Sequence, residues 1–317
     1  MTINNLSAKE RDCFFVFDNF LGDSEWARRI RRRVLQSSTH RFNAFITGPV
    51  GTGKRLIARA LHEHGPRRSQ PFIPVDCSTL PGQMSYSQLF GKAYRETTTL
   101  GCFRAAHGGT IYLGNVERLD HDTQRELLNV CETNRVVPEG TMESHFVDVR
   151  VIVGSKNNLE SEVKSGRLRA DLYKKLCVLG FETTSLRSRP SDVIPIANHF
   201  AAKLTFERGL CHKQFGKAAL ERMMSYEWPR NVQELHGVVD KAIGNTPSDA
   251  DTISSDAVHL PALALHEEKT WTSLAELELQ HIQETLIHTR GDNSRAAELL
   301  GIDRAELEEK LARLFPR

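Results

Sequence analysis

Phe45-Ile46-Thr47-Gly48-Pro49-Val50-Gly51-Thr52-Gly53-Lys54-Arg55-Leu56-Ile57-Ala58-Arg59-Ala60 is the stretch that decides the fold. Its Gly48-x4-Gly53-Lys54 spacing is typical of a loop whose backbone N–H groups cradle phosphates while the lysine reaches the outer ones. Asn43 to Thr47 reads as a buried strand, and apolar residues repeat at helical spacing after Lys54. The sequence therefore predicts an ATP-binding loop between a strand and a helix, formed by Gly48, Pro49, Val50, Gly51, Thr52, Gly53, Lys54, Arg55 and Leu56.

The composition is that of a globular protein with hydrophobic cores of ordinary size. The 317 residues suggest two or three domains, and 39% hydrophobic content is enough to fill them. The six cysteines include no C-x-x-C pair, which argues against a disulfide framework or a zinc knuckle and suits a reducing cytoplasm. The chain has neither an apolar run long enough to span a membrane nor a signal-peptide core at Met1 to Asp18. We expect a cytoplasmic protein with no membrane partner, and the net charge of +2 identifies no other partner.

The hydrophobic pattern divides the chain. Residues 42 to 180 alternate strands with helices, which predicts an α/β fold with a doubly wound parallel sheet. Residues 190 to 245 are wholly helical, the polar stretch Gly244 to Ser255 reads as a domain boundary, and Thr270 to Arg317 is helical again. The strand candidates are Ala44 to Thr47, Phe72 to Asp76, Thr110 to Leu113 and Val147 to Gly154.

An arginine-rich helix is expected near the N-terminus. Trp26 to Leu35 holds five arginines around Trp26, Ile30, Val34 and Leu35, which fall on one helical face. Packing of that face on the nucleotide domain is the favoured interpretation, and a nucleic-acid contact is the alternative.

Together these features resemble the AAA+ bacterial enhancer-binding proteins, which activate RNA polymerase carrying sigma-54. The resemblance runs from about Leu21 to Arg313. Its motifs are Thr47 to Arg59, Pro71-Phe72-Ile73-Pro74-Val75-Asp76-Cys77, Leu89-Phe90-Gly91, Ala106-His107-Gly108-Gly109-Thr110, Gly166 to Tyr173, Trp228 to Leu235, and Asn293 to Ile302.

The resemblance implies an oligomer that forms rings and binds ATP as its ligand. Its implied partners are DNA and the RNA polymerase that carries sigma-54. It also implies an AAA+ doubly wound sheet with a helical lid, followed by an all-α helix-turn-helix domain. The expected division is a short extension at 1–20, the α/β nucleotide-binding subdomain at 21–185, the lid at 186–246, a linker at 247–269 and a Fis-type helix-turn-helix at 270–317.

The acidic pair that the family uses for hydrolysis is absent. Gly114-Asn115 aligns with the strand end that normally reads Asp-Glu, where Asp helps to hold magnesium and Glu polarises the attacking water. Phosphoryl transfer depends on positioning and charge stabilisation, so losing both carboxylates should cost orders of magnitude in rate. Magnesium binding is in doubt for the same reason. The family also lacks the loop hydroxyl that Arg55 replaces here.

Asp76 has two interpretations in this sequence. In the family the water-polarising Glu pairs with an Asn on the neighbouring strand, and Asp76 occupies that position, so acid and amide are exchanged between Asp76 and Asn115. A catalytic role for Asp76 is one interpretation. The other is a strand-end carboxylate that bonds nearby amides.

The element that touches sigma-54 in the family is altered. Only Lys92 to Leu100 separate Leu89-Phe90-Gly91 from Gly101-Cys102-Phe103, whereas the family has a longer hairpin tipped by a Gly-Ala-Phe-Thr-Gly-Ala motif. A shorter polar tip cannot make the same contact, so direct remodelling of sigma-54 is doubtful. Tyr94 is the one aromatic residue there that could replace the family's Phe.

By this comparison, one of the two arginines that contact a neighbouring subunit's ATP is preserved. Arg169 matches one of two arginine fingers that reach a neighbour's ATP, and Lys175 occupies the second position. Lysine supplies charge without the planar fork and is the weaker clamp on a phosphate. Gln233 replaces the lid arginine, with Arg230 as a possible substitute.

The helix-turn-helix predicts DNA binding, but its charge opposes it. Thr270 to Arg317 carries six Lys plus Arg against nine Asp plus Glu, a net charge of minus three. Phosphate repulsion therefore predicts weak binding or a dimerisation role alone. The residues expected to reach DNA are Arg295, Arg304, Lys310 and Arg313, and the helices expected are Thr270 to Leu286, Asn293 to Leu300 and Asp303 to Leu314.

Two functions remain open from the sequence. The first is a sigma-54-type transcriptional regulator that binds ATP and DNA, with weak or absent hydrolysis. The second is a pseudo-ATPase subunit that modulates rings of an active relative.

Overall fold

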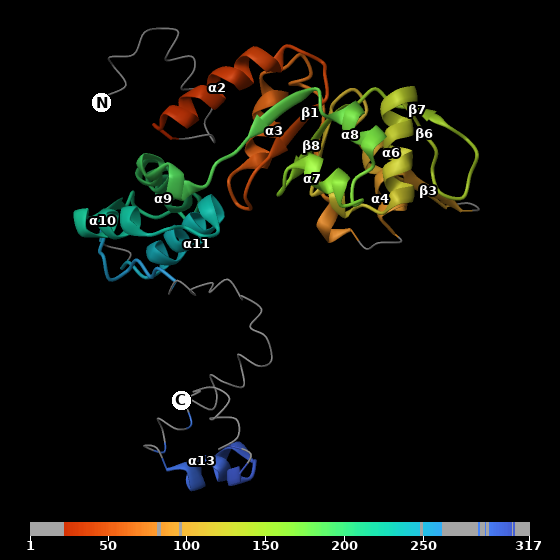
Figure 1. The fold of residues 1–317 in the computed structure, drawn as a ribbon. Coiled ribbons are helices and arrows are strands. Elements are labelled where there is room, and N and C mark those ends of the chain that lie inside the picture. The colour runs from red at the N-terminus through yellow and green to blue at the C-terminus, as the bar shows by residue number, and fades with distance from the viewer. Residues whose placement is uncertain are drawn as a thin grey trace. The chain divides into compact units, whose positions relative to one another are not determined.

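Five parallel strands form the central sheet in the part of the chain that the structure describes. The computed structural model describes residues 22–80, 84–94, 97–247, 250–261, 285, 289, 292–305 and 307. The strand order is β2-β5-β8-β1-β9, and β1 and β8 lie side by side in Figure 1. The three inner strands read as continuous apolar runs because helices cover both faces. The strands are β1 (Ala44–Thr47), β2 (Phe72–Asp76), β5 (Thr110–Gly114), β8 (Arg150–Ser155) and β9 (Leu179–Glu182).

Helices pack on both faces of this sheet, which confirms the doubly wound prediction. Ile46, Tyr112 and Ile152 pack against the helices of one face, while Leu113 and Val153 pack against those of the other. The first face is covered by α2 (Glu25–Ser38) and α3 (Lys54–Glu63), and the second by α4 (Ser85–Phe90), α5 (Cys102–Ala105), α6 (His121–Thr133), α7 (Leu159–Lys164) and α8 (Ala170–Leu176).

Two strands differ from the sequence prediction. β8 begins at Arg150 rather than Val147, because the carbonyl of Asp148 accepts hydrogen bonds from Gly108 N and Arg67 Nη1 instead of joining the ladder. β9 was absent from the strand candidates. It is a four-residue edge strand, and Gly180 and Glu182 dilute its apolar signal.

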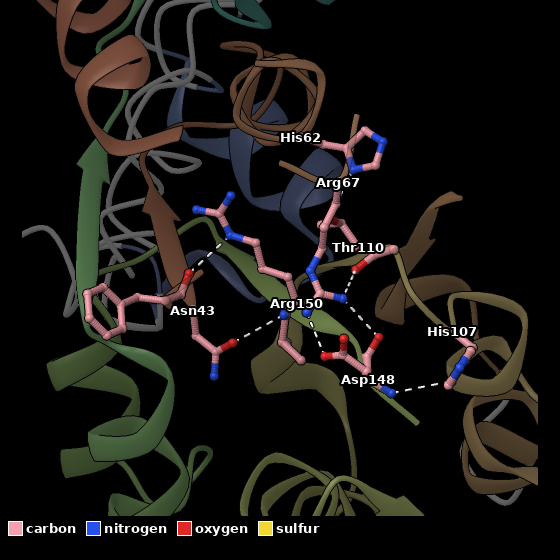
Figure 2. Close-up of polar contacts among 10 residues, drawn as sticks. Asn43, His62, Arg67, His107, Thr110, Asp148 and Arg150 are labelled. Atoms are coloured by element: carbon pink, nitrogen blue, oxygen red, sulfur yellow. Dashed lines mark hydrogen bonds and ion pairs between the residues drawn. The ribbon is translucent and has the colours of Figure 1, made fainter. Parts of the chain in front are cut away.

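A polar network closes the edge of the sheet where its strands begin (Figure 2). Arg67 Nη2 lies 2.6 Å from Asp148 Oδ1, and the Asp148 amide donates to His107 Nδ1 at 3.3 Å. Arg150 Nε donates to Phe42 O at 3.1 Å, and Asn43 Oδ1 accepts from Val151 N. This edge is tied together by its own side chains.

The arginine-rich helix α2 packs its apolar face as predicted. Ile30 and Val34 are buried against α3, and Ser24 caps the helix by accepting a hydrogen bond from Ala27 N. The Arg189 guanidinium stacks over the Trp26 ring, 4.2 Å from its centroid.

A helical subdomain follows the sheet, as predicted for residues 190 to 245, although this range also holds the short strand β10 (Gln214–Phe215). Its helices are α9 (Val193–Glu207), α10 (Lys217–Ser225) and α11 (Asn231–Gly244) (Figure 1). Its strands are β10 and β11 (Thr252–Ile253). The division expected at residue 247 stays a prediction, and part of the expected linker packs with this subdomain. Ile253, Ala257 and Val258 are buried with α9 to α11, and β11 pairs with β10. The polar residues of Gly244 to Ser255 suggested a linker, but Ile253 among them is buried.

Two small hairpins project from the α/β part. The first lies in the segment that is shorter than in the family and consists of β3 (Gly91–Tyr94) and β4 (Thr97–Leu100). The second consists of β6 (Arg135–Val136) and β7 (His145–Phe146). Backbone bonds join the two, since Ala93 N donates to Glu139 O and Glu139 N donates to Gly91 O.

Residues 261–317 form a compact unit of their own. The predicted helix and turn are confirmed by α13 (Asn293–Leu300) and by Gly301 at φ +67°. Ala296, Ala297 and Leu307 form one buried cluster. The expected helix Thr270 to Leu286 lies outside the described residues except for Thr285. Within the ranges given above, no helix combines the length and apolarity needed to cross a bilayer.

Candidate functional site

The glycine loop after β1 takes a conformation that only glycine adopts easily. Gly48, Gly51 and Gly53 have φ of +130°, +76° and +99°. A Cβ on Gly48 would lie 2.2 Å from Thr183 Oγ1, and one on Gly51 would lie 2.1 Å from Arg230 O. The loop is therefore fitted between the end of β9 and the helical subdomain.

Side chains from distant segments hold this loop. Thr52 Oγ1 donates to Pro49 O at 2.8 Å and shares a 2.7 Å hydrogen bond with Thr183 Oγ1. From the helical subdomain, Asn231 Nδ2 donates to Val50 O at 2.8 Å, and Asn231 Oδ1 accepts from Leu186 N at 2.7 Å. Asn231 itself has φ +55°, the left-handed region that asparagine tolerates.

Replacing Asn231 with alanine is expected to lower the free energy of unfolding by about 3 kcal/mol, because two buried hydrogen bonds are lost and alanine is strained at positive φ. Urea denaturation followed by circular dichroism measures the change. Asn198→Ala, at an exposed position of α9, is the matched control and should shift the value by less than about 0.5 kcal/mol. Equal free energies of unfolding for Asn231→Ala and Asn198→Ala would show that Asn231 does not hold the glycine loop.

A cavity of about 580 Å³ lies beside the loop, at the edge where the strands end. It joins the phosphate loop to the ends of β2 and β5 and to α9 and α11. Its lining residues are Val50, Gly51, Gly53, Lys54, Arg55, Pro74, Val75, Asp76, Tyr112, Gly114, Asn115, Phe200, Val232, Gln233 and His236. Ligands of open α/β sheets bind at this edge of the fold.

Lys54 places a cation in this cavity. Its Nζ donates to Gly48 O at 2.6 Å and to Pro49 O at 2.8 Å. Burial lowers the pKa of Lys54, the nearby Glu117 carboxylate opposes that shift, and Lys156 adds to it. A phosphate entering here would meet an ammonium group beside a row of loop amides.

Asp76 and Asn115 are in contact, as the acid and amide exchange requires. Asn115 Nδ2 donates to Asp76 Oδ1 at 2.9 Å, and the Ser78 hydroxyl donates to the same oxygen at 2.7 Å. Partial burial would raise the pKa of Asp76, but the bonds from Ser78 and Asn115 outweigh it and hold the pKa below its usual value. Asp76 is thus an ionised carboxylate at the cavity, while Gly114 supplies no side chain.

Comparisons with known proteins place this geometry in a family. Residues 20–182 match the family described as Sigma-54 interaction domain, residues 187–293 the AAA+ ATPase lid domain, and residues 273–314 the bacterial regulatory proteins of the Fis family. The chain belongs to the sigma-54 interaction domain family. It therefore combines the sigma-54 interaction domain with an AAA+ lid and a C-terminal helix-turn-helix of the Fis family.

Several relatives share most of this chain. The nitrogen fixation protein AnfA of Azotobacter vinelandii is 32% identical over 96% of this chain and 58% of its own length. The response regulator PilR of Pseudomonas aeruginosa is 30% identical over 94% and 70%. The structure of NtrX from Brucella abortus in complex with ATP has a TM-score of 0.71 at 25% identity, over 96% of this chain and 72% of NtrX. The chain spans about half to two thirds of the length of many curated relatives that it matches, from 49% upward.

The members of the predicted phosphate loop divide into two groups. Val50, Gly51, Gly53, Lys54 and Arg55 line the cavity. The remaining members, Gly48, Pro49, Thr52 and Leu56, support the loop through carbonyl, hydroxyl or core contacts.

Arg169 and Lys175, the expected finger positions of the family, do not line the cavity of their own chain. Arg169 lies at the start of α8, and its guanidinium bonds Asp171 at 3.1 and 2.6 Å. Lys175 lies near Cys131 of α6. A role at a neighbour's ATP remains a prediction.

The expected DNA-contacting residues are only partly described. Arg295 and Arg304 are exposed in the helix-turn-helix unit, and Arg304 Nη1 donates to Ser294 Oγ at 3.2 Å. Lys310 and Arg313 lie outside the described residues.

Sequence reasoning missed one wall of the site and one buried acid outside its lining. Phe200, Val232 and His236 form an apolar and aromatic wall, and the Phe200 and His236 rings meet edge to face at 4.8 Å. The i, i+4 spacing of Val232 and His236 was the available signal. The other omission is the buried carboxylate of Glu117, two residues after Asn115.

Proposed function

We propose that this regulator binds ATP in the 580 Å³ cavity and hydrolyses it weakly or not at all. The observation that carries the proposal is the pairing of an intact phosphate loop with a strand end that lacks carboxylates. Lys54 and the loop face the cavity, whereas Gly114 offers no side chain and Asn115 is bonded to Asp76. NtrX, which shares this fold, has been crystallised with ADP and with ATP.

Triphosphate and base would occupy opposite ends of the cavity. The phosphates lie toward Lys54, where ammonium and amides favour negative charge. The adenine lies toward Phe200, Val232 and His236, where apolar and aromatic side chains bury its faces. Binding therefore depends on the lid as well as on the loop.

Calorimetry with the whole chain tests this function. Titrating ATP or ADP without magnesium should give saturable heat, since loop and lysine do not require the metal. Phosphate release should stay near the rate of the buffer blank. Absence of heat at millimolar nucleotide contradicts ATP binding, and turnover comparable with an active family member contradicts weak hydrolysis.

We further propose that the helix-turn-helix binds DNA weakly. Mobility-shift assays should show a complex at about 50 mM salt that is lost by about 200 mM, because few phosphates are neutralised and the unit is acidic overall. The double variant Arg295→Ala, Arg304→Ala should weaken the complex further, while Arg125→Ala in α6 should not. No complex with any duplex at low salt would favour dimerisation alone.

A pseudo-ATPase subunit is the second candidate. Gly114-Asn115 removes the hydrolytic acids and leaves the binding elements, which suits a subunit that enters rings of an active relative. The short β3–β4 hairpin agrees with a reduced direct contact with sigma-54. Mixing with an active relative distinguishes the candidates. If ATP turnover per active subunit falls on mixing, the chain is a pseudo-ATPase subunit. If the chain alone hydrolyses ATP at a rate that rises with its concentration, it forms catalytic rings itself.

A further inference from the structure

Arg55 lines the cavity directly after Lys54, in the first turn of α3. Its side chain is exposed, and within the described part of the chain its guanidinium forms no ion pair or hydrogen bond. Arg59, one turn later on the same helix, differs, because its Nε lies 2.7 Å from Glu63 Oε1. The cavity therefore holds a second cation beside Lys54 that is free to bind the negative charge of a ligand.

The position of Arg55 in the helix is unfavourable without such a ligand. The dipole of a helix places partial positive charge at its N-terminus, so cations in the first turn are destabilising there. Lys54 and Arg55 are the first two residues of α3, and its first turn holds no acidic residue. A bound polyanion would remove this cost, because it faces both side chains and the helix N-terminus together.

The residues at this end of the cavity do not fit a magnesium ion. In phosphate-loop proteins the metal is held by a hydroxyl directly after the loop lysine and by an acid at a strand end. Here those positions are Arg55 and Gly114-Asn115, which supply a cation, no side chain and an amide. Asp76 is the one carboxylate among the described lining residues. Its Oδ1 already accepts hydrogen bonds from Ser78 N, Ser78 Oγ and Asn115 Nδ2.

Other groups near the end of β5 do not restore the balance toward a metal. The buried Glu117, whose Oε2 has no hydrogen-bond partner among the residues described, does not line the cavity. Tyr112, which does line it, lies on the strand that ends at Gly114. Burial raises the pKa of Tyr112, and the Arg55 charge opposes that rise. The positive charge of Arg55 is thus felt at the strand that would hold the metal.

We propose that the Arg55 guanidinium takes the place of magnesium in this cavity and binds the outer phosphates of ATP together with Lys54. The inference rests on the proposed ATP binding, and it adds that this binding needs no divalent cation. A guanidinium always carries its charge and presents two parallel N–H groups to phosphate oxygens. It also repels a dication, so magnesium adds little to the affinity. An acid placed at position 114 would supply a metal ligand and favour magnesium again.

The test is calorimetric titration of the whole chain with ATP, in EDTA and in excess magnesium chloride, for wild type and Arg55→Gln. Wild type should bind with about the same affinity in both buffers. Arg55→Gln removes the charge from an exposed helical position and should weaken binding in EDTA about 10- to 100-fold, the value of one hydrogen-bonded charge. With magnesium the loss should be smaller, because the metal ion then neutralises phosphate charge and is no longer repelled.

Two further variants make this result specific. Arg59→Gln removes the same charge from an exposed position of the same helix, outside the cavity lining, and should behave like wild type in both buffers. Arg55→Lys keeps the charge without the planar fork and should lose less affinity in EDTA than Arg55→Gln. It also serves if the glutamine variant fails to fold.

The outcomes separate this inference from the proposed function. If wild type binds no ATP in either buffer, ATP binding itself fails. If wild type binds ATP only with magnesium, or about tenfold or more tightly with it, the metal supplies a full charge contact. The role of Arg55 is then overturned, while ATP binding stands. Wild-type affinity of Arg55→Gln in EDTA overturns it as well, and so does an equal loss in Arg59→Gln.

Discussion

Replacing Lys54 with alanine is expected to weaken ATP binding about 10- to 100-fold, the value of one hydrogen-bonded charge at a phosphate. Lys54 Nζ is the cation beside the loop, bonded to Gly48 O and Pro49 O, and it can turn from those carbonyls to the outer phosphates. Calorimetry in EDTA isolates the effect, since no metal then shares the phosphate charge.

A matched control keeps this result specific. Lys217→Ala removes the same charge from α10, where the side chain is 92% exposed. It should leave ATP affinity unchanged. Equal affinity of Lys54→Ala and wild type would show that nucleotide, if bound, does not use the glycine loop.

Restoring the acidic pair is expected to raise ATP hydrolysis by at least about 100-fold, the typical effect of one preorganised catalytic group. The variant combines Gly114→Asp with Asn115→Glu and Asp76→Asn. A Cβ at Gly114 meets only ordinary contacts, the nearest being the Tyr112 ring at 3.4 Å. Phosphate release at saturating ATP and magnesium, over a range of protein concentration, measures the gain.

The third substitution is needed because Asn115 Nδ2 lies 2.9 Å from Asp76 Oδ1. With Asp76 unchanged, a glutamate at position 115 would place two carboxylates close together, and their negative charges would repel each other. Gly114→Asp with Asn115→Glu alone should therefore gain less than the triple variant. A triple variant that binds ATP and stays inactive would show that the defect lies elsewhere, for example at the positions of Arg169 and Lys175. If Asp76 already activates water in wild type, Asp76→Asn alone will lower the basal release.

Local signals predicted the fold well. The glycine spacing, the apolar runs of β1, β2 and β5 and the helical periods of α9 to α11 concern residues within about a dozen positions, where backbone preference and burial act together. The same logic failed for β9 and β11. These short strands hold one or two apolar residues each, and their stability comes from partners far along the chain.

By itself, the sequence determined the glycine loop with Lys54, the parallel α/β sheet, the helical subdomain and the absence of carboxylates at Gly114 and Asn115. These properties follow from residue type and near-neighbour spacing. Only the tertiary structure decided which groups face the cavity. The Asn115 bond to Asp76 joins residues 39 apart, and the Asn231 bond to Val50 joins residues 181 apart. The unpaired Glu117 oxygen depends equally on the packing around it, because solvent exclusion and hydrogen-bond geometry arise when separate segments meet.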